Sequence, residues 1–277
     1  MSTAELVVVQ ASSSRASSFA VSTPGDREQL NQQVQAVLGV TLATAAEIVQ
    51  AFDDVVAKPL QLNLSTKKGR ELAKRNPMIY TVRGTTTVDE WVDRALADWE
   101  TSAIEGHIGT WMEEVARIVS GGMKPGSGVD LQIERRGAPL ITELYAIQAA
   151  PNTKSAGGSR SDVDALRRAA GALRAGRRVV ELYVAVLHGR SKTAPLGADP
   201  NIVKLASDAF WEKVSAIPDF RARLLKASTI LASLVAGRAA TEVARIKAEA
   251  TEIFGDARGN LRLDVLTNPP AGRQARR

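Results

Sequence analysis

The chain has 277 residues, 44% of them hydrophobic, and lysine plus arginine outnumber aspartate plus glutamate by 36 to 30. This length allows a sizeable core in one domain, or in one domain plus a helical appendage, and no apolar run approaches the roughly 18 residues that a membrane span needs. The absence of cysteine excludes disulfides and zinc knuckles, and two histidines, His107 and His188, argue against a histidine-based metal site or triad.

The net charge and the N-terminal sequence limit which partners and which cellular location are expected. A net charge of +6 is compatible with a nucleic-acid partner, although many basic proteins bind none. The N-terminus has no basic start followed by an apolar segment, so we expect a soluble intracellular protein. Any metal should be a hard cation with oxygen ligands, such as Mg²⁺.

The first third of the chain predicts a lead-in and then helices. Residues 1–26 contain a Ser/Ala-rich stretch that we expect to be flexible, and residues 27–86 form a predicted helical N-terminal region. Within it, helices over 27–57 should be stopped by Pro59. The following polar stretch carries a run of charges that more often marks a solvated face than a phosphate contact, namely Lys67, Lys68, Arg70, Lys74 and Arg75.

Residues 87–119 give the strongest helical pattern. Asp89 and Glu90 stand in the first turn, apolar residues recur at helical spacing, and two glycines follow at 121 and 122. Glu105 and Glu113 should share a face, because eight residues are close to two turns. The four tryptophans should pack in cores rather than stack on bases: Trp91, Trp99, Trp111 and Trp211.

The middle of the chain predicts a mixed sheet. Residues 129–135 alternate like a strand, residues 140–149 are apolar enough for a strand buried on both faces, and residues 178–187 form a third strand. A helix from Ser161 to Gly176 would make the third strand parallel to the second. We place a core domain at 87–200, helices only at 201–266, including a long one over 220–254, and a basic tail at 267–277.

The candidate chemistry lies at one end of the predicted hairpin. Ala146 and Gln148 point to one face of their strand because side chains alternate, and Asp130 on the neighbouring strand could lie at the same edge. Glu113 could reach this place from the preceding helix. Two carboxylates and the Ile147 carbonyl would make an oxygen-lined seat for Mg²⁺, and Gln148 could orient water without supplying a charge.

Six segments in order resemble the PmeII-type restriction endonucleases, a branch of the PD-(D/E)XK nuclease superfamily. They cover roughly residues 60–220 and read KRNPMIY, GTWMEEVA, GVDLQIER, AIQAAPNTKSA, LHGR and DAFWEKVSA. The resemblance implies an α/β (α+β) fold with a mixed central sheet flanked by helices, and helical additions at both ends. It places Asp130 at the family's metal-binding aspartate, and Glu113 and Glu105 at acids of the preceding helix.

The resemblance also implies a function. The chain would be a Mg²⁺-dependent type II restriction endonuclease that hydrolyses phosphodiester bonds at a short specific sequence in double-stranded DNA. Such an enzyme would be a bacterial cytoplasmic homodimer, with the helices after Pro200 as candidates for the dimer contact and a companion DNA methyltransferase acting on the same sequence. Five residues near strand ends would hold the DNA: Asn152, Lys154, Arg160, Arg190 and Lys192.

The sequence departs from the family at the reaction centre. The family's Ser-Ile-Lys-Ser-Gly-Pro-Asn stretch is matched by residues 146–152, in which the lysine is Gln148 and both serines are alanine. Three interpretations follow: Gln148 replaces the lysine, Lys154 supplies the ammonium from the next loop, or the chain binds DNA and cuts it weakly or not at all. A helical scaffold protein without a DNA partner is a further alternative.

Overall fold

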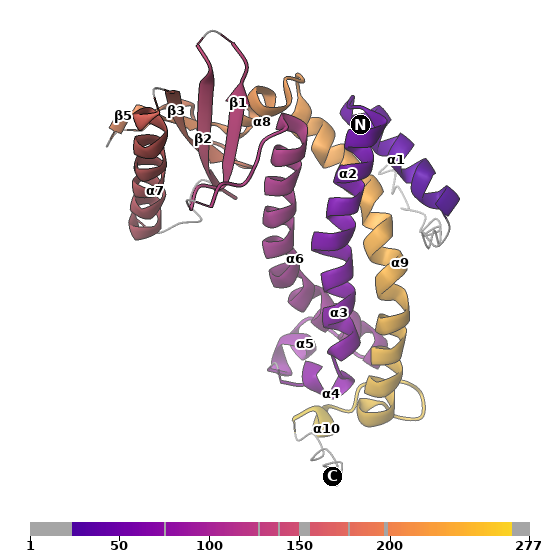
Figure 1. The fold of residues 1–277 in the computed structure, drawn as a ribbon. Coiled ribbons are helices and arrows are strands. Elements are labelled where there is room, and N and C mark those ends of the chain that lie inside the picture. The colour runs from indigo at the N-terminus through magenta and orange to yellow at the C-terminus, as the bar shows by residue number, and fades with distance from the viewer. Residues whose placement is uncertain are drawn as a thin grey trace, which may run out of the picture.

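The computed structural model describes residues 24–267, apart from Arg75, Ser127, Ala138, Arg177 and the stretches 150–155 and 197–198. Most of the predicted lead-in and nearly all of the predicted basic tail therefore lie outside the described residues. The described chain forms a mixed sheet covered by helices, from which a long helical arm extends (Figure 1).

The sheet has five strands in the spatial order β1-β2-β3-β5-β4. Strands β1 and β2 form the predicted antiparallel hairpin, β3 runs parallel to β2, and β5 runs parallel to β3 with β4 antiparallel at the edge. The predicted mixed sheet and its helical crossover are confirmed. The strand bounds are Leu131–Arg135 (β1), Ile141–Gln148 (β2), Val179–Val186 (β3), Ala194–Leu196 (β4) and Asp199–Leu205 (β5).

Helices cover both faces of the sheet. The crossover helix α7 (Ala156–Ala175) lies on one face, where its Leu166 packs with Leu144 and Ala146 of β2. On the other face Tyr145 and Ile147 of β2 join the core that α6 (Val88–Ser120) and α8 (Ser207–Ser215) complete. Strand β2 is therefore buried on both sides, as its continuous apolar sequence predicted.

The arm consists of helices that run away from the sheet (Figure 1). Helices α6 and α9 (Phe220–Phe254) pack with α2 (Leu42–Phe52), the π-helix η1 (Asp53–Ala57) and α3 (Lys58–Thr66), while α1 (Pro24–Leu38) lies against α2 and α9. Short helices close the far end: α4 (Gly69–Leu72), α5 (Met78–Val82) and α10 (Leu263–Thr267).

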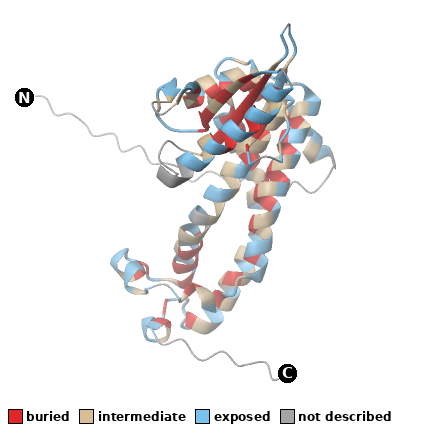
Figure 2. Cartoon of the chain, turned by 60° about the vertical axis from the view of Figure 1, so that its left-hand side comes forward, coloured by how far each residue is buried: buried red, intermediate tan, exposed pale blue. Residues whose placement is uncertain are grey.

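Buried residues follow the arm as well as the sheet (Figure 2). A separate core at the far end of the arm joins Leu64, Tyr80, Trp91 and Phe254. Trp91, Trp111 and Trp211 are fully buried and Trp99 packs partly buried against this core, which confirms that the tryptophans pack. No single helix among the described residues is long and apolar enough to cross a membrane, although the bent pair Gly25–Leu38 and Leu42–Thr66 meets that test together.

The two longest helices match their predicted ranges because their ends are encoded locally. The hydroxyl of Thr87 accepts a hydrogen bond from the Glu90 amide at the start of α6. Gly121 ends this helix with a positive φ of 64°, a conformation that glycine adopts at little cost. The structure also bears out the predicted helix 220–254, which ends at Gly255.

Three expectations were wrong. Pro59 does not stop the helices, because the helical backbone continues through it: the π-helix η1 precedes α3 directly, and both Ala57 and Lys58 keep helical dihedral angles. The predicted all-helical region after Pro200 begins inside β5, which buries Ile202 and Leu205 against β3. Helix α7 begins at Ala156 rather than Ser161.

A buried ion pair joins two helices of the arm that are distant in sequence. The Asp53 side chain in η1 is only 6% exposed, and Arg238 of α9 donates hydrogen bonds of 2.9 Å to each of its oxygens. Arg27 and Lys58 approach the same carboxylate to 3.7 Å. The pair therefore fixes η1 against α9 at a point where an unpaired carboxylate would be costly.

Replacing Arg238 by Met should destabilise the chain, because Asp53 would lose both short hydrogen bonds while it stays buried. We expect a loss of about 2–3 kcal/mol in the free energy of unfolding, less than for a fully buried pair because Arg238 is itself partly exposed. Urea unfolding would measure the loss. Arg262→Met, which breaks an exposed pair with Asp264, is the matched control and should cost under about 1 kcal/mol. Equal losses in the two variants would contradict this account.

Candidate active site

The structure brings Asp130 to the end of β2. Its amide donates to the Tyr145 carbonyl at 3.0 Å, which extends the β1–β2 ladder by one residue. Its carboxylate oxygen Oδ2 accepts a hydrogen bond of 2.6 Å from the Ile147 amide. Two of the residues predicted from sequence are thus in direct contact, and the carboxylate lies at the edge of β2 where β1 begins.

The Ile147 carbonyl leaves the strand on the same side as Asp130. In a strand, the N–H and C=O of one residue point to the same edge, and the next residue points to the opposite edge. The Gln148 carbonyl accepts from the Leu187 amide, on the β3 side, so the Ile147 peptide faces β1. A carboxylate and a backbone carbonyl therefore share one edge and offer two oxygen donors.

The Gln148 side chain points toward α7, whereas the Ile147 side chain points toward α6 and α8 on the opposite face of the sheet. Gln148 is 6% exposed, and its amide nitrogen Nε2 donates to Oδ2 of Asp162 in α7 at 3.4 Å. Asp162 is not among the site residues predicted from the sequence. The signal that could have found it is its place in the second turn of the helix that follows β2, where inward side chains meet the strand end.

Glu113 lies on α6, across the sheet from Gln148. A Cβ built on Gly109, one turn earlier in α6, would lie 3.9 Å from Cβ of Ala149, so the helix passes the end of β2. Glu113 is partly buried one turn farther along, toward β1, and Glu105 is exposed one turn before Gly109. Asp130 lies between the two helical layers, whereas Glu113 and Gln148 belong to opposite ones.

The donor set at this edge consists of oxygens. Carboxylates from Asp130 and Asp162, the Ile147 carbonyl and the Gln148 amide are ligands that suit a hard cation such as Mg²⁺. Among the described residues, no group of three or more histidine, cysteine, aspartate or glutamate side chains is placed to hold a metal ion. The edge therefore fits a centre with few carboxylates, completed by carbonyl, amide and water oxygens.

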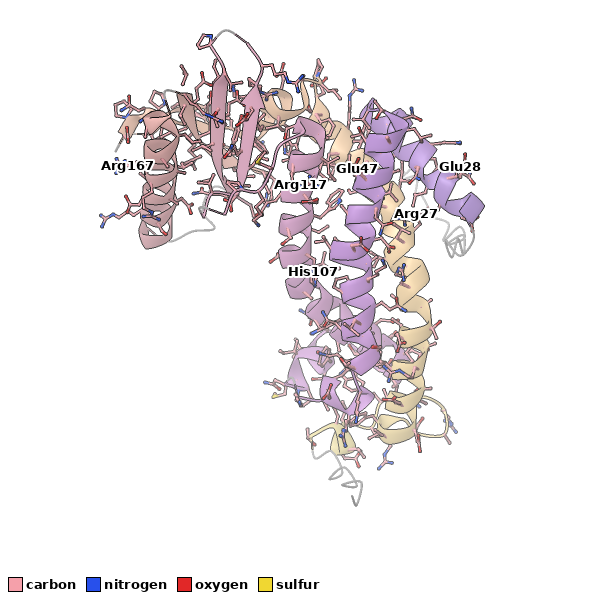
Figure 3. All side chains as sticks on the ribbon, viewed as in Figure 1. Arg27, Glu28, Glu47, His107, Arg117 and Arg167 are labelled. Atoms are coloured by element: carbon pink, nitrogen blue, oxygen red, sulfur yellow. The ribbon has the colours of Figure 1, made fainter. Side chains whose placement is uncertain are left out.

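Several predicted DNA contacts surround this end of the sheet. Arg160 near the start of α7, and Arg190 and Lys192 after β3, are exposed. His188 is exposed too, and its amide donates to the Ala149 carbonyl at 3.1 Å. Asn152 and Lys154 lie outside the described residues. Figure 3 places Arg117 near the sheet end of α6 and His107 farther along the arm.

An apolar pocket of about 270 Å³ lies beside the same edge, between α6 and the start of α9. His188 and Arg221 are its charged or titratable lining residues, and most of the others are aliphatic or aromatic, including Trp111 and Leu225. Hydrolysis of a phosphodiester needs groups that bind phosphate and orient water. The edge carrying Asp130 supplies oxygen donors for a cation, whereas the pocket is lined mostly by apolar side chains.

The architecture and the edge define a class of protein. A mixed five-stranded sheet flanked by helices, with Asp130 bonded to the residue before Gln148 on the next strand, is a PD-(D/E)XK-like nuclease fold. The family model of the type II restriction endonuclease EcoO109I matches residues 44–232, well over half of the chain. The chain therefore belongs to this family of type II restriction endonucleases, which are nucleases that act on DNA. A search of curated proteins finds no match.

A second charged cluster lies on the α6 side of the sheet and is structural. Glu143 of β2 is 3% exposed, and its carboxylate binds Lys213 of α8 at 2.8 Å, Arg135 at 3.1 Å and the Tyr145 hydroxyl at 2.7 Å. Burial alone would raise the pKa of Glu143, but the hydrogen bonds from Lys213 and Tyr145 outweigh it, so this pKa is lowered. The cluster fastens α8 to the hairpin, away from Gln148.

Lys213→Met should destabilise the chain in a pH-dependent way. Because the pKa of Glu143 is lower in the folded state than its ordinary value of 4.5, its stabilisation is present above pH 4.5 and is lost as the pH falls through the folded pKa. We expect the variant to lose about 2 kcal/mol in free energy of unfolding at pH 7, with Arg135 limiting the loss, and the gap to wild type to shrink below pH 4.5.

Urea unfolding from pH 3 to pH 8 would measure that gap. Lys226→Met removes an exposed lysine of α9 and serves as the control, with no change beyond a few tenths of a kcal/mol. A gap between Lys213→Met and wild type that stays constant across this range would refute the role assigned to the Glu143–Lys213 contact.

Proposed function

We propose that this chain is a Mg²⁺-dependent endonuclease that cleaves both strands of DNA at one short sequence, as a PmeII-type member of its family. The observation that carries the proposal is the hydrogen bond between the Asp130 carboxylate and the Ile147 amide. It sets a carboxylate, a backbone carbonyl and the Gln148 side chain at one strand end. Membership of a restriction endonuclease family supports DNA as the substrate.

Each residue of the edge has a proposed role. Asp130 and Glu113 bind Mg²⁺ with their carboxylates and Ile147 contributes its carbonyl oxygen. When bound, Mg²⁺ lowers the pKa of a water molecule and neutralises the charge that develops on the phosphate. Gln148 positions the attacking water: its Nε2 is directed at Asp162, which leaves Oε1 to accept a hydrogen bond from that water.

The absence of a lysine at position 148 sets a limit on the rate. An amide orients water but carries no positive charge, so it cannot stabilise the phosphate charge as an ammonium would. Lys154, in the loop after β2, is the alternative source of that charge. If neither residue acts, the chain is a DNA-binding relative with weak or no cleavage.

Binding of the DNA backbone falls to exposed basic residues around the edge. Arg160, Arg190 and Lys192 are proposed phosphate contacts, together with Asn152 and Lys154. Such contacts hold the duplex in register and leave the choice of sequence to side chains that reach the base edges.

A homodimer would match a two-fold DNA site, and its contact is proposed to involve helices after Pro200. Helix α9 already packs against α1, α3, α4, α6 and α8 within the chain, so only its remaining surface is free for a second copy. A companion DNA methyltransferase and a bacterial cytoplasmic location complete the proposal. Light scattering of the purified chain would give its oligomeric state.

The proposal predicts discrete fragments from an unmethylated plasmid of known sequence incubated with Mg²⁺, with ends that map to one short sequence. Gln148→Ala should slow cleavage by roughly 10²-fold, the lower end of the contribution of a positioned group that handles a water proton. Gel analysis of the cleavage time course would measure both effects. Random nicks or an intact plasmid would sink the sequence-specific nuclease.

Lys154→Ala separates the two sources of catalytic help. If Lys154 supplies the ammonium, this variant should lose activity instead of Gln148→Ala. If neither variant cuts more slowly than wild type, both assignments fail. Asp130→Asn should be inactive in either case, because the proposed centre keeps no other carboxylate from the hairpin.

DNA binding measured in Ca²⁺, which supports binding without cleavage, should depend steeply on salt. Each phosphate contact removed should lower the slope of log K against log salt by about 0.9. We expect such a decrease for Arg190→Ala and for Lys192→Ala, and none for Arg262→Ala beside α10 at the far end of the arm. Fluorescence anisotropy with a mixed-sequence duplex would measure the slopes. Binding that ignores salt would exclude a phosphate-contacting protein.

A further inference from the structure

We propose that Asp162 of α7 is a further carboxylate of the reaction centre, where it binds the divalent cation together with Asp130. This inference rests on the proposed nuclease function and concerns the same edge of the sheet. It adds a residue from the crossover helix to a centre that the hairpin alone leaves short of acids.

The need for an acid from another element follows from the residues of β2. At the end of this strand stand Ala146, Ile147 and Gln148, none of which carries a charge. Asp130 is the one carboxylate that the hairpin brings to this edge. Divalent cations in proteins are commonly held by carboxylates, so further acids have to reach the edge from outside the hairpin, and Asp162 is one that the structure brings to the strand end.

Geometry directs Asp162 to this edge. Its Oδ2 lies 3.4 Å from Nε2 of Gln148, the side chain at the very end of β2. Asp162 also shares the inner face of α7 with Leu166, one turn farther along, which is fully buried in the core between α7 and the sheet. A carboxylate in this position is directed at the strand end and is partly buried.

The same helix packs against the segment that leads into Asp130. A Cβ built on Gly128 would lie 3.9 Å from Cβ of Ala165, which is one turn beyond Asp162. Val129 belongs to the same core as Leu166. Helix α7 therefore contacts both segments of the centre, the approach to Asp130 and the end of β2, within one turn of Asp162.

Asp164 provides the contrast within the same helix. Two residues on, it points to another face, is 58% exposed and pairs with Arg167 at 3.7 Å. Figure 3 shows Arg167 on α7, across the sheet from the arm. Asp164 has the same side chain in the same helix but lies away from β2, which makes it a matched control.

Mn²⁺ binding to the full-length chain without DNA tests the proposal independently of cleavage. Free Mn²⁺ would be titrated by electron paramagnetic resonance against wild type, Asp130→Asn, Asp162→Asn and Asp164→Asn. We expect Asp130→Asn and Asp162→Asn each to weaken binding at least about tenfold, because even residues that only orient metal ligands contribute that much. Asp164→Asn should bind like wild type, and Asp162→Glu, which keeps the carboxylate, should bind more tightly than Asp162→Asn.

Two results would overturn the proposal: wild-type Mn²⁺ affinity in a folded Asp162→Asn, or no Mn²⁺ binding by wild type. Circular dichroism would establish folding, and Asp162→Ser is the second variant if Asp162→Asn does not fold. Failure of the proposed function would be seen in a different experiment, as a plasmid that stays intact when it is incubated with the wild-type protein and Mg²⁺. A chain that binds Mn²⁺ through Asp162 without cutting DNA would keep this inference and lose that function.

Discussion

Burial of β2 on both faces is the constraint on which the rest of the structure depends. Its even-numbered side chains pack under α7 and its odd-numbered ones under α6 and α8, so both layers of helices are fixed by one strand. At Gln148 the strand ends, and there the two layers, the start of β1 and the end of β3 come together. Polar side chains from all four of these elements can come close together at this end, whereas a polar side chain in the middle of β2 must find its partner within the core.

The two polar clusters of the sheet differ in whether their charges are paired within the protein. Glu143, in the buried part of β2, is held by Lys213, Arg135 and the Tyr145 hydroxyl, which together satisfy its charge. The edge near Asp130 instead carries the Asp130 carboxylate and the Ile147 carbonyl at the end of the strand. Oxygens of this kind suit a hard divalent cation, whereas the Glu143 carboxylate is already paired with Lys213 and Arg135.

The arm depends on contacts that join residues distant in sequence. Asp53 and Arg238 are far apart along the chain, and their pair sets η1 against α9. Helix α6 runs through both parts of the molecule, with Trp111 in the core shared with the sheet and Trp91 in the core at the far end. Through this helix the position of the sheet is tied to that of the arm.

The sequence by itself determined the elements whose signals are local. Thr87 and Gly121 delimit α6, and the apolar run of β2 gave both the strand and its two-sided burial, because capping and periodicity act within a few residues. Only the tertiary structure decided that Pro59 lies inside a helical run, that a strand occupies 199–205, and that Asp162 meets Gln148. These depend on neighbours brought in from elsewhere in the chain, which no local pattern records.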